Sequence, residues 1–288
     1  MSKKFQDLDL CNAFLFAVAL EDPETCRLIL EIILGHSIPE VVVHTEHNIM
    51  LNTEFKSVRL DVYARDGLHV NYDMEAQNDD EKNLPKRSRY YQAELDASTL
   101  KPGEDYNKLE PSYIIFICTF DPFGKGLYCY TFEERCLECD ISLGDGTKKI
   151  FLNTKGKNAA EVSEELVHFL GYMEQSTDKY VENIPENSIR RIHGRVQKIK
   201  QWRKMEERYM TMEELVQDRE RKSHREGLAE GLAKGLVSAV LDLLSDMGSV
   251  PEALEAQIKS ERNPDTLRNW NKVAAKSDSI EEFISKIQ

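Results

Sequence analysis

Hydrophobic and polar positions alternate with two different periods in the first part of the chain. Between about Leu10 and Leu34 apolar residues recur at helical spacing, interrupted at Asp22-Pro23, and a loop is expected through His36–His47. From Phe55 to Gln77 the alternation has a period of two, which predicts a β-hairpin. Asp66-Gly67 is its predicted turn, because this pair tolerates the positive φ angles of a type I′ turn.

The segments that follow alternate between helix and strand. Residues 85–100 are expected to form a helix with Pro85 near its start, where a missing N–H group costs least. Ser112–Phe120 is almost continuously apolar, which is typical of a strand buried on both faces. Further strands are expected at 127–132 and 149–153, and a helix at 161–174. This order predicts an α/β or α+β fold, in which a sheet is covered by helices.

Strand patterns end near residue 183, and the remainder is expected to be helical. Ile189–Trp202 has the spacing of an amphipathic helix, and Glu226–Leu236 repeats with a period of four. Residues 237–288 are expected to form a small helical tail. We therefore predict three parts: a domain over 1–180, a helical segment over 181–236, and the tail over 237–288.

The repeat places Gly227, Gly231 and Gly235 one helical turn apart. Each glycine costs about 1 kcal/mol relative to alanine inside a helix, so a compensating interaction is expected. Close approach of a partner helix is one interpretation, and it would make the chain a homo-oligomer through its C-terminal helices. A low-complexity repeat with a frayed helix is the other.

Composition and charge narrow the functional classes. The chain has 288 residues and a formal net charge of −13, which argues against a protein that coats nucleic acid indiscriminately. The N-terminus lacks the pattern of a signal peptide, and no apolar run is long enough to span a bilayer. We therefore expect a cytoplasmic protein with reduced thiols and no membrane partner.

Local charge departs from this average between Ser188 and Met205. This stretch holds seven basic residues and no acid. It could follow a DNA backbone. Alternatively, it could be the solvent face of a helix whose positive charges balance the acidic residues in 205–220. The seven residues are Arg190, Arg191, Arg195, Lys198, Lys200, Arg203 and Lys204.

The candidate chemistry lies on the predicted hairpin. Glu75 and Gln77 are two residues apart on a strand and so share a face, and pairing brings Asp61 on the preceding strand near them. Two close carboxylates repel each other unless a cation lies between them. Mg²⁺ typically takes one or two carboxylates and leaves positions for water and phosphate. The alternative is that this polar face is simply the solvent side of an antiparallel sheet.

Longer stretches of sequence around these residues resemble a known family. They are similar to the PD-(D/E)XK nuclease family transposases, the recombination-promoting (Rpn) nuclease group, over roughly residues 5–175. The resemblance is carried by Arg59-Leu-Asp-Val-Tyr-Ala64, Tyr72-Asp-Met-Glu-Ala-Gln77, Leu84-Pro-Lys-Arg-Ser-Arg-Tyr-Tyr-Gln-Ala93, Pro111-Ser-Tyr-Ile-Ile-Phe-Ile-Cys-Thr-Phe-Asp-Pro-Phe123 and Ile150-Phe-Leu-Asn-Thr-Lys-Gly156.

The resemblance implies a restriction-endonuclease-like mixed sheet flanked by helices, with a helical C-terminal extension. It also implies a DNA endonuclease dependent on Mg²⁺ or Mn²⁺, with a link to recombination or mobile elements. Asp61 and Glu75 would be its metal ligands, and Gln77 would be its third catalytic residue. The wider superfamily usually carries lysine at the third position, and glutamine offers only neutral hydrogen bonds.

A nearby cation could replace that lysine. Lys86, Arg87 and Arg89 on the following helix are the candidates, and we also expect them to contact the DNA phosphates. The substitution by Gln77 leaves a second hypothesis open, in which the chain is a weak or inactive nuclease fold that serves as a DNA-binding or protein-interaction module.

One further motif is the pair Cys136-Leu-Glu-Cys139. His44 and His47 could in principle complete a zinc set with these cysteines. The two pairs are some ninety residues apart, so we interpret the thiols as buried or incidental.

Overall fold

A computed structural model describes residues 3–44, 50–52, 57–59 and 62–287. The chain divides into two compact units, Met1–Met210 and Thr211–Gln288. None of the helices in these ranges combines the length and the apolar composition that are needed to span a lipid bilayer.

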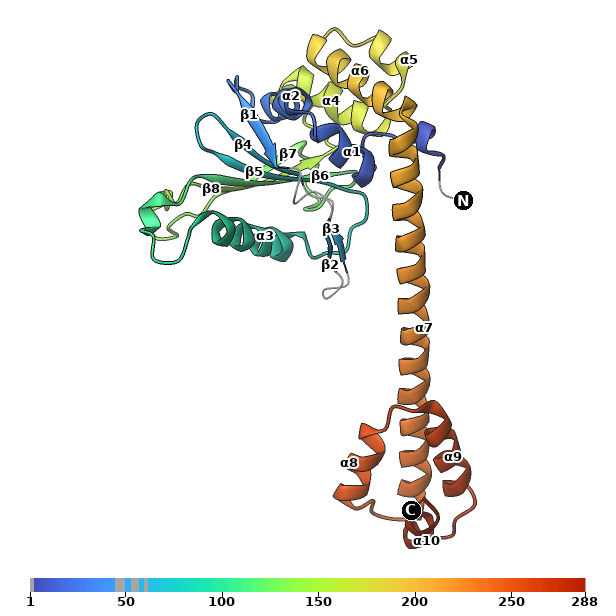
Figure 1. The fold of residues 1–288 in the computed structure, drawn as a ribbon. Helices are drawn as coiled ribbons and strands as arrows, with labels where there is room; N and C mark the ends of the chain where they lie inside the picture. Colours follow the sequence, from blue (N-terminus) through green and yellow to red (C-terminus); the bar gives the residue numbers. More distant parts are fainter. Residues whose placement is uncertain (1–2, 45–49, 53–56, 60–61, 288) are drawn as a thin grey trace. The chain divides into compact units, whose positions relative to one another are not determined.

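The first unit is built on a mixed six-stranded sheet with the order β1-β4-β5-β6-β8-β7 (Figure 1). The pairs β1–β4, β4–β5 and β7–β8 are antiparallel, whereas β5–β6 and β6–β8 are parallel. A separate two-stranded sheet pairs β2 with β3. The strands are β1 (Val41–His44), β2 (Met50–Asn52), β3 (Ser57–Arg59), β4 (Val62–Asp66), β5 (Asn71–Gln77), β6 (Ser112–Cys118), β7 (Cys129–Phe132) and β8 (Thr147–Asn153).

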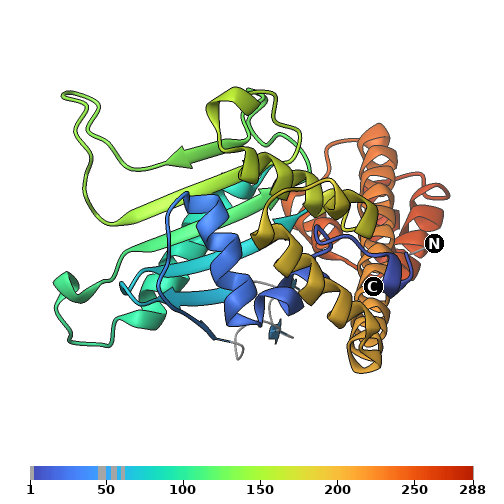
Figure 2. The same ribbon diagram turned by 90° about the horizontal axis from the view of Figure 1, so that it is seen from above.

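Helices cover both faces of this sheet, as the sequence predicts. α3 packs against β6 on one face, while α1 packs against β5 and α2 against β1 on the other (Figure 1). α4, α5 and α6 form a further helical layer on α1 and α2, which Figure 2 shows from above. The helices are α1 (Ala13–Leu20), α2 (Pro23–Leu34), α3 (Leu84–Thr99), α4 (Glu164–Glu174), α5 (Asp178–Glu182) and α6 (Asn187–Gln201), with short 3₁₀ turns at Phe5–Asp7, Tyr106–Lys108 and Ala159–Glu161.

The predicted break at Asp22-Pro23 is confirmed as the boundary between α1 and α2. The Asp22 side chain accepts a hydrogen bond from the Thr25 N–H, and Pro23 occupies the first turn of α2. Gly35 ends that helix with a φ of 71°, in the left-handed region that favours glycine. The loop expected over 36–47 is wrong in part, because Val41–His44 forms the edge strand β1.

The hairpin between β4 and β5 is confirmed, but its predicted type I′ turn is wrong. The Asp66 carboxylate closes a longer connection by accepting the Leu68 and Val70 N–H groups, each at 2.9 Å. His69 has the positive φ, 64°, and Gly67 does not. Hydrogen bonds to a side-chain carboxylate therefore close this connection, and it does not need the positive φ at Gly67 that a type I′ turn requires.

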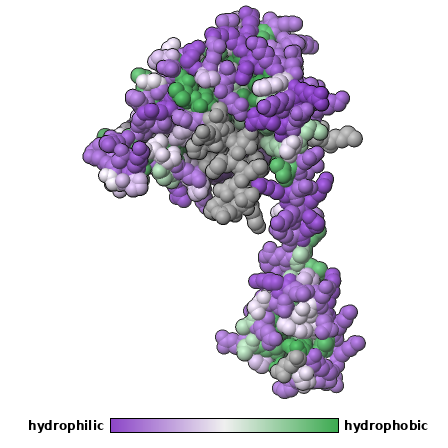
Figure 3. Space-filling model, in the orientation of Figure 1, coloured by the Kyte–Doolittle hydropathy of each residue, from purple (hydrophilic) through white to green (hydrophobic). Residues whose placement is uncertain are grey.

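The second unit has its own hydrophobic core, formed where the end of α7 (Arg203–Met247) packs with α8 (Glu252–Ser260), α9 (Pro264–Ala274) and α10 (Ile280–Ile287) (Figure 1). Some hydrophobic residues of this unit also reach its surface, in green in Figure 3. Leu244, Leu267 and Phe283 are fully buried in it. Apart from the glycine itself, its two chain neighbours and the adjoining backbone of α7, no heavy atom of the described chain lies within 4 Å of a Cβ placed on Gly227, Gly231 or Gly235. The glycine repeat therefore has no close helix partner within the described chain, and the predicted self-association stays a prediction.

Candidate active site

The polar face of β5 lies beneath α3. The register sets Asp73 beside Ile114, Glu75 beside Phe116 and Gln77 beside Cys118 on the parallel neighbour β6. These neighbours in β6 belong to the hydrophobic cluster that α3 covers. Asp73 is only 3% exposed, and the side chain of Glu75 is 14% exposed. The acidic face of this strand is therefore not the solvent side of the sheet, which was the alternative interpretation.

Arg87 of α3 links the two candidate residues of β5. Its guanidinium forms an ion pair with Glu75 Oε1 and donates a hydrogen bond of 3.2 Å to Gln77 Oε1. The amide nitrogen of Gln77 in turn donates to the Asp79 carbonyl oxygen at 2.7 Å, which directs the Gln77 oxygen toward Arg87. A helix residue thus brings a positive charge to the strand position where lysine is absent.

Aromatic rings hold this guanidinium in place. The Arg87 Cζ atom lies 5.5 Å from the centre of the Tyr91 ring, one turn further along α3, and 5.3 Å from that of Phe116. Burial lowers the pKa of Arg87, but the charge and hydrogen bond of Glu75 outweigh that effect, so the pKa is raised overall. Arg87 is therefore a fixed positive charge at this site.

The site contains buried polar atoms without hydrogen-bond partners among the described residues. They are Glu75 Oε2 and Arg87 Nε. Leaving a buried acceptor unpaired costs about 1–3 kcal/mol, so such an atom suggests that an ion or a water molecule binds there. A carboxylate oxygen is also the ligand that hard divalent cations prefer. Glu75 therefore fits a metal ligand through Oε2, while its other oxygen is held by Arg87.

The remaining predicted ligand, Asp61, lies outside the described residues. Val62, the first described residue after it, is opposite Met74, which directly precedes Glu75. Within the described part of the chain, no three His, Cys, Asp or Glu side chains are grouped so that they could hold a metal ion.

A family comparison adds to this geometry. The model of the PD-(D/E)XK nuclease family transposases matches residues 15–226, which is well over half of the chain. The chain belongs to this family. No curated protein and no solved structure gives a significant match. The mixed sheet and its helical cover agree with a PD-(D/E)XK nuclease fold, and nucleases of this kind generally use divalent metals.

The three basic candidates on α3 of this PD-(D/E)XK nuclease fold occupy different environments. Lys86 and Arg89 are exposed, whereas the Arg87 side chain is 22% exposed. Among the described contacts, Arg87 is the member of this set that reaches Glu75 and Gln77. The structure therefore distinguishes Arg87 from Lys86 and Arg89, which the sequence alone does not.

One residue that the sequence reasoning left out shares this face. Asp73 is two residues before Glu75, so its side chain lies on the same side of β5, opposite Tyr63 of β4. Burial raises the pKa of the Tyr63 hydroxyl, and the Asp73 charge adds to that effect. The alternation with a period of two that places Glu75 and Gln77 on one face also places Asp73 there, so the sequence alone could have suggested it as a candidate site residue.

Part of the basic run at 188–205 contacts the protein itself. Arg191 forms an ion pair with Glu24, Arg190 donates to the Ile184 carbonyl oxygen at 2.6 Å, and Arg203 pairs with Glu207 at 3.1 Å. Lys200 is buried, and burial lowers its pKa. Lys198 and Lys204 are exposed. These contacts leave a smaller basic surface than the sequence alone suggests.

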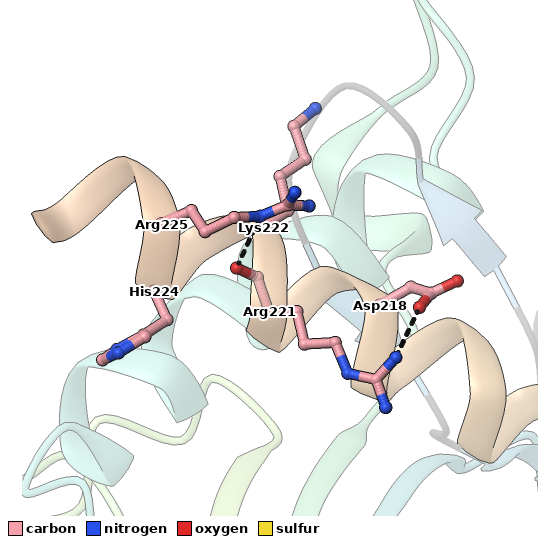
Figure 4. Close-up of a pocket in the computed structure, with 5 residues that line it drawn as sticks. All are labelled: Asp218, Arg221, Lys222, His224 and Arg225. Atoms are coloured by element: carbon pink, nitrogen blue, oxygen red, sulfur yellow. Dashed lines mark hydrogen bonds and ion pairs between the residues drawn. The ribbon is translucent and has the colours of Figure 1, made fainter. Parts of the chain in front are cut away.

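A concave region of about 710 Å³ lies along α7 (Figure 4). The residues that line it are Asp218, Arg221, Lys222, His224 and Arg225. Arg221 pairs with Asp218 at 3.5 Å, and Arg225 Nε donates to the Arg221 carbonyl oxygen at 3.3 Å. All five lining side chains belong to one helix that is largely exposed here, so we interpret the region as a solvated helix face. A ligand pocket, by contrast, encloses most of its ligand.

Proposed function

We propose that this chain is a metal-dependent DNA endonuclease that hydrolyses phosphodiester bonds. The observation that carries the proposal is the Glu75–Arg87–Gln77 contact on the α3 face of β5. In this arrangement a largely buried carboxylate keeps one oxygen without a hydrogen-bond partner in the described chain, beside a fixed positive charge. Family membership supports a nuclease with a DNA substrate.

Glu75 would hold the metal together with Asp61. A divalent ion bound there supplies a water of lowered pKa and stabilises charge that develops at phosphorus. Mg²⁺ or Mn²⁺ fits this oxygen-rich donor set. The ion would also relieve the repulsion between the two carboxylates.

Arg87 would supply the positive charge that lysine usually provides in the wider superfamily. A guanidinium presents several N–H donors in one plane, so it can hold Glu75 and Gln77 together and stay charged at any working pH. Gln77 would position Arg87 and the substrate through its neutral amide. Lys86 and Arg89, both exposed on α3, would contact the DNA backbone as non-specific phosphate ligands.

A second function is favoured by the same contact. Because Arg87 already occupies one oxygen of Glu75, the carboxylate could be neutralised by the protein instead of by a metal. The fold would then serve as a DNA-binding or protein-interaction module without cleavage. Activity measurements separate the two functions.

Plasmid nicking tests the proposal. Wild type should nick supercoiled DNA with Mg²⁺ and stop in EDTA, and Asp61→Ala should be inactive with an unchanged circular dichroism spectrum. Asp246→Ala, which removes an exposed acid from α7, is the matched control and should cleave normally. Cleavage that persists in Asp61→Ala or in EDTA would refute the metal site. DNA binding without cleavage by folded wild type would favour the binding module.

A further inference from the structure

The connection between β7 and β8, residues 133–146, forms a small ordered arm that extends from the edge of the sheet, in yellow-green in Figure 2. An antiparallel bridge joins Arg135 to Ser142. On either side of it, the Cys136 N–H donates to the Ile141 carbonyl oxygen and the Leu143 N–H to that of Glu134, each at 2.8 Å. The arm therefore has a fixed backbone in spite of its length.

Cys136 and Cys139 lie in the turn that closes this arm. The Asp140 N–H donates to the Cys136 carbonyl oxygen at 2.9 Å, and Asp140 has a φ of +51°, so the chain turns sharply directly after Cys139. Arg135 secures the turn by donating to the Asp140 carboxylate at 2.9 Å and to its carbonyl oxygen at 2.7 Å. Both thiols are thus presented from one short, braced turn.

The six thiols of the chain differ in burial, and Cys139 is the exposed one. Burial raises the pKa of Cys26 and Cys129, raises that of Cys11 to about 11 and raises that of Cys118 to about 12. Cys139 is exposed, and the Cys136 thiol donates a hydrogen bond of 3.1 Å to Glu138 Oε2. Of the two interpretations of these thiols, buried or incidental, burial is therefore wrong for Cys139.

The arm also exposes large apolar side chains. Leu137, between the two cysteines, is 94% exposed, Leu143 is 64% exposed and Ile141 is 61% exposed. Apolar side chains gathered at a projecting tip are typical of a surface that is covered in an assembly. The thiols and the apolar residues belong to the same turn, so one partner would meet both.

The turn itself supplies only part of the ligand set that a structural zinc ion needs. Structural zinc sites take four ligands, and the turn supplies two. No group of three possible ligands exists within the described residues. His44, which the sequence offers as a further ligand, lies on β1 at the opposite edge of the six-stranded sheet, and His47 lies outside the described residues.

We propose that the arm is half of a zinc site, completed by the same arm of a second copy of this chain. Cys136 and Cys139 of both copies would bind one Zn²⁺ as four thiolates, and their four protons would pass to solvent. Such a contact is isologous, because the same surface meets itself across a two-fold axis. Leu137 of each arm would be covered on assembly. The site does not depend on nuclease activity.

Zinc titration of the full-length, metal-free and reduced protein tests this site. We expect uptake of about one zinc ion for two chains, a ratio that holds even if the chains also associate elsewhere. Light scattering should show chains associating as zinc is added. Co²⁺ in place of zinc should give the absorption of a tetrahedral tetrathiolate ion.

Matched variants separate this site from zinc bound elsewhere on the chain. Cys136→Ser and Cys139→Ser should each abolish uptake at this ratio, whereas Cys129→Ser on the adjoining strand should not. Leu137→Asp keeps both thiols and should weaken zinc-driven association on the order of tenfold. One zinc ion per chain, uptake that survives in Cys136→Ser, or no uptake by the reduced protein would each overturn the proposal.

Discussion

The two faces of β5 are built from alternate residues of one strand, yet they differ in how completely their polar groups are satisfied. On the α1 face, Met74 is fully buried, and the Tyr72 hydroxyl donates to Asp66 Oδ2 at 2.7 Å. On the α3 face, Glu75 Oε2 and Arg87 Nε have no hydrogen-bond partner among the described residues. One face completes the fold, and the other leaves a carboxylate oxygen available for a ligand.

This difference predicts that stability and chemistry can be changed separately by substituting neighbouring residues. A side chain on the α1 face contributes close packing, so its loss acts on the free energy of unfolding. A side chain on the α3 face contributes charge and ligand atoms, so its loss acts on cleavage. Substitutions at Met74, Glu75, Tyr72 and Arg87 test that separation.

Met74→Ala should have the largest effect, and it should act on stability alone. Removing a fully buried side chain of this size lowers the free energy of unfolding by about 2–5 kcal/mol, because a cavity remains. Urea unfolding measures the loss. Nicking per folded molecule should equal that of wild type at a temperature where the variant is folded; a large fall in that specific rate would show that the two faces are coupled.

Glu75→Gln should act on cleavage instead. The substitution keeps the volume of the side chain but removes the charge that a metal ligand needs, so nicking should fall at least about a hundredfold. Glu110→Gln is the control, since it removes another partly buried partner of an arginine, Arg65, outside the site. Equal nicking by both variants would exclude Glu75 as a ligand.

The separation between the two faces also explains what could be predicted from the sequence. Strand and helix periodicity predicts the hairpin, α3 and β6 correctly, because these elements repeat over many residues. The short edge strand β1 was missed, and the turn at Asp66 was wrong, because a side-chain carboxylate closes it. Local pattern carries little information about such short segments.

Only part of the candidate site could be predicted from the sequence. Alternation places Glu75 and Gln77 on one face, but it does not say whether that face meets solvent or a helix. The contact between Glu75 and Arg87 depends on how α3 packs across β5, twelve residues away along the chain. Lys86, Arg87 and Arg89 are alike in sequence, and the packing of α3 distinguishes them.

Tyr72→Phe should have a smaller effect on the stability face. The hydroxyl is buried and donates to Asp66, so its removal leaves that carboxylate oxygen without its donor at a cost of about 1–3 kcal/mol. Burial and the bond to Asp66 both raise the pKa of Tyr72, so the hydroxyl is protonated and able to donate at neutral pH. Tyr113→Phe, whose ring meets that of Tyr72 edge to face, is the control for loss of a tyrosine hydroxyl. Thermal unfolding of the two variants should differ clearly, and equal midpoints would contradict the role of this bond.

Arg87→Lys should have the smallest effect, and it decides how the α3 face works. Lysine keeps the positive charge but cannot hold Glu75 and Gln77 at once, so nicking should fall about tenfold, with a larger loss in Arg87→Met. Arg65→Lys, at an arginine that pairs with Glu110 outside the site, is the control and should cleave normally. If Arg87→Lys or Arg87→Met instead cleaved faster than wild type, the guanidinium would be withholding Glu75 from the metal. Arg87 would then restrain the site rather than replace its missing lysine.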